Sequence, residues 1–182
     1  MEFPSDAELL EQFRKTETAN SAFNLIVRKY QQRVYMHIRR MVIDHDDADD
    51  IAQNTFIKVW KGLENFREDS QLFTWIYRIA TNECLTFLKQ KSKRFFLPIG
   101  DVEKELSEKL SHEPSLKGDQ IEMKLQKANL SLPDKQRIVF NMRYYDEMKY
   151  EKMSEVLGTS VGALKASYHI AAQKIEKIIR GN

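Results

Sequence analysis

Residues 47–91 read DADDIAQNTFIKVWKGLENFREDSQLFTWIYRIATNECLTFLKQK, and this stretch decides the fold. Its apolar residues recur every three or four positions on both sides of a polar segment, residues 64–70, which predicts two amphipathic helices joined by a loop. The inward stripe of the first helix is Ile51, Ala52, Thr55, Phe56, Val59 and Leu63. That of the second is Leu72, Ile76, Ile79 and Ala80, followed by Cys84 or Leu85 and by Phe87 or Leu88.

The opposite faces of these two helices are polar. The first turns outward Asp47, Asp50, Gln53, Asn54 and Lys58, and the second turns outward Thr74, Arg78, Asn82 and Lys89. The second helix also carries the aromatic residues Phe73, Trp75 and Tyr77. Aromatic faces beside amides and cations hold unstacked bases, although Phe73 and Tyr77 fit a core role equally well.

Helical periodicity continues towards the N-terminus. Ser5 and Glu8 form a capping box for a short helix that ends near Phe13, and a long helix with apolar residues three and four apart follows from Ala22 to Val42. Almost no segment alternates with a period of two, and the four prolines lie outside the helical patterns or at their starts. We therefore expect an all-α protein.

The chain divides into two small helical domains, residues 1–94 and 119–182. Residues 95–118 begin with FFLPIG, which breaks helicity, and continue as an acidic stretch with Ser and Lys, so they predict a flexible linker. In the second domain Pro133 stands at a first helical position.

The C-terminal domain ends in a helix-turn-helix pattern. A short helix at 149–157, the turn Gly158-Thr159-Ser160 and a final helix towards Arg180 with Ser160 as its cap predict this motif. The inward stripe of the final helix is Val161, Leu164, Tyr168, Ala171, Ile175 and Ile178, and its outward residues are Gly162, Ala163, Lys165, Ala166, Ser167 and His169.

The charge is unevenly distributed. The whole chain has a net charge of +2, but from Leu125 onward ten basic and six acidic residues give +4, which suits a polyanionic partner. The single Cys84 excludes an internal disulfide and a cysteine zinc site, and its position predicts burial. The start of the chain lacks a signal-peptide pattern and no apolar run approaches ~20 residues, so we expect a cytoplasmic protein without a membrane span.

The acidic run from Asp44 to Asp50 does not fit a metal site. An EF-hand loop starting at Asp44 needs glycine at its sixth position and glutamate at its twelfth, where this chain has Asp49 and Thr55. A two-metal nuclease needs carboxylates from separate elements. No Gly-rich phosphate loop and no nucleophile paired with a base is evident, so we expect neither a cofactor nor an enzymatic activity. The run is a solvated helix start or a protein-binding face.

The polar and aromatic positions follow an ordered pattern. It comprises Asp47-Ala48-Asp49-Asp50, Gln53, Phe56, Trp60, Asn65-Phe66-Arg67, Ser70, residues 73–80 (FTWIYRIA) and Asn82. The C-terminal part adds residues 150–153 (YEKM) and 157–165 (LGTSVGALK). In both parts the chain resembles the extracytoplasmic-function (ECF) sigma factors of bacterial RNA polymerase. It departs from them at Glu68, where glycine is frequent, and at Ser167 and Ile170, where arginine often stands.

The resemblance implies a factor that binds core RNA polymerase, through its clamp coiled coil and its flap, as well as promoter DNA and an anti-sigma factor. The residues it implies for clamp binding are Asp47, Asp50, Gln53, Asn54, Lys58 and Trp60. Those implied for the −10 element are Asn65, Phe66, Arg67, Ser70, Thr74, Trp75, Arg78, Asn82 and Lys89, with Lys91, Lys93 and Arg94 on phosphates. Those implied for the −35 element are Ser160, Gly162, Ala163, Lys165, Ala166, Ser167 and His169.

The residues alone leave other functions open. A helix-turn-helix regulator with an N-terminal sensory domain accounts for residues 149–180, but not for the polar face of residues 47–60. A helical adaptor does not need the basic C-terminal part. His169 is equally well explained as a plain exposed residue.

Overall fold

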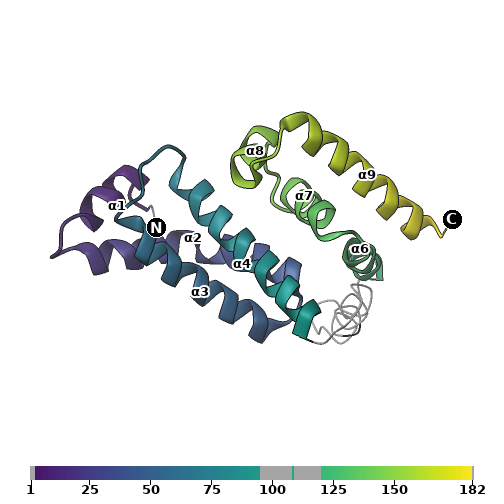
Figure 1. The fold of residues 1–182 in the computed structure, drawn as a ribbon, viewed down its shortest axis with the longest axis horizontal. Helices are drawn as coiled ribbons and strands as arrows, with labels where there is room; N and C mark the ends of the chain where they lie inside the picture. Colours follow the sequence, from purple (N-terminus) through teal and green to yellow (C-terminus); the bar gives the residue numbers. More distant parts are fainter. Residues whose placement is uncertain (1–2, 95–107, 109–119, 182) are drawn as a thin grey trace.

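Eight α-helices and no strand make up the part of the chain that the computed structural model describes, residues 3–94, 108 and 120–181 (Figure 1). The N-terminal helices are α1 (Asp6–Phe13), α2 (Ala19–Val42), α3 (His45–Leu63) and α4 (Leu72–Arg94). The C-terminal helices are α6 (Gln120–Leu130), α7 (Asp134–Tyr144), α8 (Tyr150–Leu157) and α9 (Val161–Arg180). The all-α prediction is confirmed. The segment predicted as a linker, 95–118, lies outside the described residues except for position 108.

Local sequence explains where the N-terminal helices begin. The Ser5 hydroxyl accepts a hydrogen bond from the backbone N–H of Glu8 at 3.2 Å, and the Glu8 carboxylate accepts one from the Ser5 N–H at 2.7 Å, so the predicted capping box is confirmed. Asp44 caps α3 by accepting from the Asp47 N–H at 3.1 Å. The carboxylates of Asp46 and Asp47 in the first turn also favour the helix dipole.

Helices α2, α3 and α4 pack on one another, and α1 packs on α2 (Figure 1). Fully buried side chains at their centre include Ile26, Val34, Ile38, Met41, Ala48, Val59, Ile76, Ala80 and Cys84. The predicted burial of Cys84 is confirmed, and burial raises the pKa of its thiol to about 12. Helix α4 contacts α2 and α3, and α8 as well, so it is covered on more than one side.

The C-terminal helices α6, α7 and α9 surround a second, smaller core of Leu125, Ala128, Leu132, Phe140, Ala171 and Ile175. Helices α8 and α9 form the predicted helix-turn-helix. Gly158 ends α8 in the left-handed conformation (φ 63°), which glycine adopts without strain, and Ser160 caps α9 by accepting from the Ala163 N–H at 3.3 Å.

Two predicted details of the C-terminal helices are wrong. Pro133 has an extended ψ of 142° and precedes α7 as its N-cap, so the helix itself begins at Asp134. Ile178 is 50% exposed instead of buried. Its neighbours Glu176, Lys177 and Arg180 are exposed too, which shows that the last turn of α9 extends beyond the helices that cover the rest of its apolar stripe.

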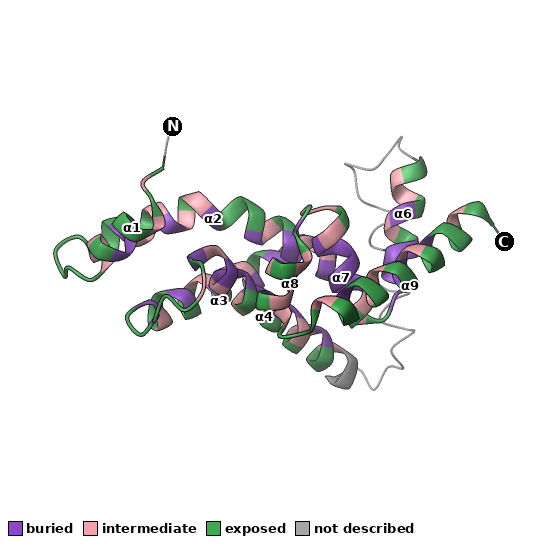
Figure 2. Ribbon diagram, turned by 90° about the horizontal axis from the view of Figure 1, so that it is seen from above, coloured by how far each residue is buried: buried purple, intermediate pink, exposed green. Residues whose placement is uncertain are grey.

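The N-terminal and C-terminal helices pack against each other. Helix α7 contacts α2, and α8 contacts α4 (Figure 1). Helix α7 has six consecutive buried residues, 137–142, because it lies between α2 on one side and α9 on the other (Figure 2). The largest core cluster is continuous across both halves: it includes Met142, Met148 and Met153 together with residues of α2 and α4.

Candidate functional site

The outer face of α3 carries polar side chains that the fold leaves largely accessible. Asp50, Gln53 and Asn54 are exposed. Two other predicted members of this face are paired with α4: Lys58 with Glu83, and Asp47 with Lys91 at 3.4 Å. The Asp47 side chain is 28% exposed and that of Lys58 is 56% exposed, so both remain reachable at the edge of the face.

Trp60 has a second, structural role. It is 37% exposed, yet its ring packs edge-on against Phe13 at 5.1 Å and against Phe23 at 4.9 Å between ring centroids. These contacts join the end of α3 to α1 and α2. One side of the indole therefore stabilises the N-terminal helices while the other side is open to a partner.

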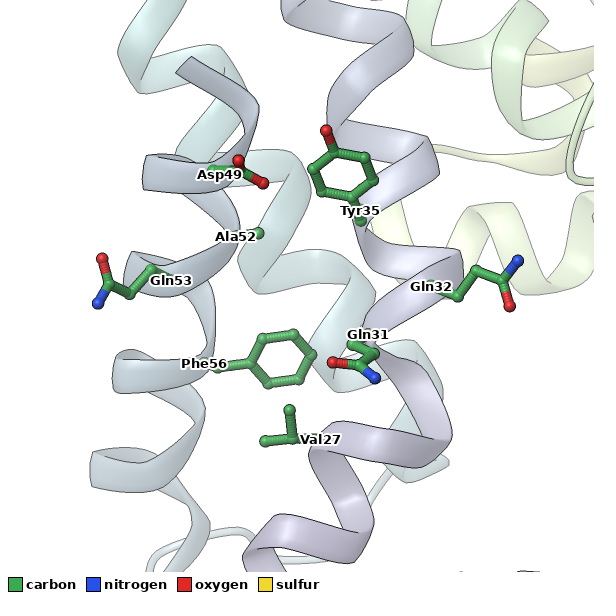
Figure 3. A pocket seen from close by; sticks show the side chains of 8 residues that line it. All are labelled: Val27, Gln31, Gln32, Tyr35, Asp49, Ala52, Gln53 and Phe56. Atoms are coloured by element: carbon green, nitrogen blue, oxygen red, sulfur yellow. The ribbon is translucent and has the colours of Figure 1, made fainter. Parts of the chain in front are cut away.

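A groove of about 570 Å³ runs beside this face between α2 and α3 (Figure 3). Val27 and Phe56 point towards one another across it, and the remaining lining residues are Gln31, Gln32, Tyr35, Asp49, Ala52 and Gln53. The contribution of α2 was missed from the sequence. Gln31 and Gln32 do not interrupt the helical pattern of α2, and only the packing of α2 on α3 makes them line the same groove as Gln53.

The loop between α3 and α4 is built on an aromatic residue. Phe66 is 9% exposed and its ring lies against that of Trp75, while Asn65 and Arg67 are exposed. Glu68 has a φ of 60°, the left-handed region in which glycine is favoured, and it forms an ion pair with Arg14 at 2.5 Å. The loop is thus tied to the end of α1.

A second cavity of about 430 Å³ lies beside the same loop. Its lining residues are Asp6, Ala7, Leu10, Phe66, Glu68, Ser70, Gln71 and Leu72. Helix α1 therefore forms one wall of the cavity. No local pattern predicts this contribution, because α1 and the loop are more than 50 residues apart along the chain.

The expectation that Thr74 points outward is wrong. Its side chain is fully buried, and its hydroxyl has no hydrogen-bond partner. A single apolar stripe predicts one buried face, but α4 is covered by α2, α3 and α8, so its buried arc also includes Tyr77 and Thr81. Tyr77 belongs to the core, and half-buried Phe73 carries the Arg33 guanidinium over its ring at 4.2 Å.

The remaining predicted residues of α4 lie on its accessible side. Arg78, Asn82 and Lys89 are exposed, and Trp75 is half-buried. The Arg78 guanidinium donates a hydrogen bond to the backbone carbonyl of Glu155 in α8. In this conformation Arg78 is therefore engaged by the C-terminal half.

The start of α9 presents a surface of small and basic residues. Gly162, Ala163, Lys165, Ala166 and His169 are exposed, as is the capping Ser160, and Ser167 is half-buried. The Lys165 ammonium lies 5.8 Å from the centre of the Tyr150 ring of α8. The first turns of α9 can therefore approach a flat or grooved partner closely, with one cation at the centre of the surface.

None of the described residues form a group of three or more His, Cys, Asp or Glu side chains placed to hold a metal ion. No helix among the described residues is long and apolar enough to cross a membrane.

Two segments of the chain match known protein families. Residues 26–94 match sigma-70 region 2, which corresponds to α2 from Ile26 through α4, and residues 122–175 match sigma-70 region 4, which corresponds to most of α6 through Ile175 of α9. The chain is 31% identical to the RNA polymerase sigma-H factor of Pseudomonas aeruginosa, over 96% of its own length and 94% of that protein. The chain belongs to the ECF sigma factors. The ECF RNA polymerase sigma factor SigW of Bacillus subtilis is 29% identical over 87% of this chain and 89% of its own length.

Solved structures share the fold of this ECF sigma factor. CnrH in complex with the cytosolic domain of CnrY superposes with a TM-score of 0.70 at 21% identity, covering 98% of this chain and 99% of CnrH. RpoE of Bartonella quintana in complex with the anti-sigma factor NepR has a TM-score of 0.68 at 17% identity, covering 87% and 96% of the two chains. As a member of this family the protein is a regulatory transcription initiation factor.

Proposed function

We propose that this ECF sigma factor binds core RNA polymerase and directs promoter-specific initiation, with the two elements of the promoter divided between its two halves. Residues 1–94 bind the polymerase and the −10 element, residues 119–182 bind the −35 element, and residues 95–118 connect them. The observation that carries the proposal is the match to regions 2 and 4 in that order along one chain. The exposed polar residues of α3 and α4 lie in the N-terminal half and those of α9 in the C-terminal half, which agrees with this division of roles.

The polymerase-binding face is assigned to α3. Asp50, Gln53 and Asn54 are exposed and unnecessary to the core, so their polar groups are available to the clamp coiled coil. Asp47 and Lys58 exchange their α4 partners for polymerase groups, and the open side of Trp60 supplies apolar area at the edge of the face. The C-terminal half is assigned to the flap.

The −10 surface is assigned to the loop and the accessible side of α4. Phe66 and Ser70 line the loop cavity, and the exposed Asn65 and Arg67 belong to the same loop, so a base extruded from the duplex finds an aromatic neighbour and polar groups there. Trp75, Arg78, Asn82 and Lys89 continue this surface along α4. Thr74 is omitted because its buried side chain does not reach the surface.

The −35 surface is assigned to the first turns of α9. The outward residues near the start of a recognition helix contact base edges in the major groove. Lys165 donates to guanine, and the small Gly162, Ala163 and Ala166 permit close approach. Ser160, Ser167 and His169 lie beside them as donors to bases or phosphates.

We also propose an anti-sigma partner, a cytoplasmic site of action and a role without catalysis. The RpoE structure contains an anti-sigma factor, and this likeness supports an anti-sigma partner for the present chain. Promoter DNA and core polymerase place its action in the cytoplasm. The protein acts by binding and itself catalyses no reaction, because polymerase supplies the chemistry.

Transcription by core polymerase on a promoter library tests this function. We expect transcripts that start downstream of a shared pair of −35 and −10 sequences only when the chain is added. Sequence-specific binding of the chain to duplex DNA without polymerase, together with no transcript from any promoter, would instead identify a conventional helix-turn-helix regulator.

A further inference from the structure

Asp146 joins the two halves of the molecule through a buried carboxylate. It lies in the turn between α7 and α8, and its side chain is only 10% exposed. Its Oδ1 accepts from the Arg40 guanidinium at 2.6 Å, and its Oδ2 accepts from the Tyr77 hydroxyl. The Nδ1 atom of His37 lies 3.7 Å from the same Oδ2. All three of these partners belong to α2 or α4, in the N-terminal half.

The surrounding contacts are specific to one docking of the halves. The Arg40 guanidinium also lies over the ring of Tyr145, 4.6 Å from its centroid, so this cation is held between two consecutive residues of the C-terminal turn. The imidazole of His37 is fully buried, and its centroid lies 4.3 Å from that of the Tyr77 ring, with the planes inclined by 35°. It also forms a hydrogen bond of 3.0 Å with the Thr81 hydroxyl. His37 is therefore held in place within the N-terminal half, whereas the Arg40 guanidinium is fixed by the docked C-terminal turn.

The turn itself is shaped to project Asp146. Glu147 has a φ of 51°, a left-handed conformation that a non-glycine residue adopts only when its surroundings hold it there. The Met148 N–H bonds the Met142 carbonyl at 2.9 Å, and the Asp146 N–H bonds the Asn141 carbonyl at 3.2 Å, which close the turn. The carboxylate is thereby directed away from its own half.

The docked arrangement occupies part of the surface proposed for the −10 element. Helices α4 and α8 are in contact, and the guanidinium of Arg78, assigned to the −10 surface, donates a hydrogen bond to the backbone carbonyl of Glu155 in α8. Arg78 can therefore reach promoter DNA only after the C-terminal half has left α4.

We propose that Asp146 is an intramolecular latch, which holds this sigma factor in a closed state by occupying a carboxylate cradle formed by Arg40, Tyr77 and His37, and which core polymerase opens. The inference rests on the proposed function for the role of polymerase, but the latch itself is a property of the free chain. The apolar contacts of Met142, Met148 and Met153 stabilise the docked halves but do not select one relative orientation. The carboxylate selects it, because in any other orientation the buried donors would lose their acceptor, which is strongly destabilising.

The test measures the distance between the two halves in the full chain. Spin labels are attached to cysteines introduced at two exposed positions, Thr86→Cys in α4 and Gln173→Cys in α9. Cys84 is fully buried with a raised thiol pKa, so it does not compete for the label. Asp146→Asn and Arg40→Gln each remove one side of the latch, and Glu151→Gln removes an exposed carboxylate of the neighbouring α8 as the matched control.

We expect one short distance for the unsubstituted chain and for Glu151→Gln. Asp146→Asn and Arg40→Gln increase the ratio of long to short distances about tenfold or more, as loss of a charged hydrogen bond requires. Core polymerase produces the long distance in every variant. The latch is refuted if Asp146→Asn, with circular dichroism equal to that of the parent, keeps the short distance alone, or if the polymerase-bound parent remains short. Failure of the proposed function has a different signature: the parent then neither binds core polymerase nor supports transcription, whatever its distances are.

Discussion

The rings of Phe66 and Trp75 lie with their centroids 4.9 Å apart and their planes inclined by 37°. This pair links the α3–α4 loop to the first turn of α4. Trp75 also rests on Gly62, where a Cβ would come within 2.9 Å of the indole. The absence of a side chain at Gly62 therefore lets the indole approach the end of α3 closely, and the loop, α3 and α4 hold one aromatic platform in place.

This platform predicts a specific defect in promoter melting. Trp75→Ala should reduce the permanganate reactivity of promoter thymines at saturating enzyme more than it reduces closed-complex formation, since stacking contributes ~1–3 kcal/mol per base. Trp75→Phe keeps an aromatic face and serves as the control. Equal losses of closed complex, melting and thermal stability in both variants would show that Trp75 acts only in the core.

The α3 face predicts a binding defect without a stability defect. The double substitution Asp50→Ala, Gln53→Ala should weaken association with core polymerase, while the free energy of unfolding changes by less than about 0.5 kcal/mol per site because both side chains are exposed. Affinity is measured by titration with labelled core enzyme, and Glu17→Ala, an exposed acidic residue in the α1–α2 segment, is the control. If the double variant binds core polymerase as tightly as the parent, the exposed face of α3 does not bind polymerase.

Lys165 on α9 separates two modes of DNA contact. If it contacts a base edge, Lys165→Ala should cost about 1–3 kcal/mol of promoter affinity and relax preference at one −35 position. If it contacts phosphate, affinity should fall evenly across sequences and the salt slope should decrease by about one unit. Unchanged affinity and unchanged −35 dependence in the Lys165→Ala, His169→Ala double variant would assign this face to another partner. Polymerase binding should be unaffected in both variants, since the α3 face is distant.

Asp146 predicts a pH dependence of stability. Burial raises the pKa of this carboxyl, but its contacts with His37, Tyr77 and Arg40 outweigh burial and hold the pKa below the ordinary 3.8. A carboxyl with a lowered folded-state pKa stabilises the fold above its unfolded value and loses that contribution as pH falls through the folded one. Urea unfolding of the parent and of Asp146→Asn should therefore differ most near neutral pH, and the difference should shrink below about pH 4. A constant difference from pH 7 to pH 3 would contradict this linkage.

Most helices could be predicted from sequence because each has an apolar stripe on one face. Ser5 and Ser160 marked two helix starts correctly, since their side-chain oxygens cap the first turn. Thr74 was misplaced because α4 is covered on several sides, and periodicity encodes only one buried face. Ile178 was misplaced because no neighbour covers the end of its stripe.

The contacts between the two halves could not be predicted from local patterns. Asp146 reads as an ordinary turn residue, and Arg40 as one of several cations beside an outer face. Only the packing of α7 on α2 and of α8 on α4 brings them together over more than 100 positions of sequence. The assignments of individual residues to polymerase and to the two promoter elements stay predictions.

The ion pair of Arg14 with Glu68 makes the shape of the α3–α4 loop depend on a helix outside the matched family region, which begins only at Ile26. A left-handed glutamate costs about 1–2 kcal/mol relative to an ordinary backbone conformation, and here the exposed ion pair with Arg14, at about 0–1 kcal/mol, offsets part of that cost. Two ECF sigma factors with identical region 2 sequences but different leading helices would then present different loops to the same promoter. If the loop binds the −10 element as proposed, a substitution at Arg14, which lies outside region 2, changes promoter recognition through Glu68.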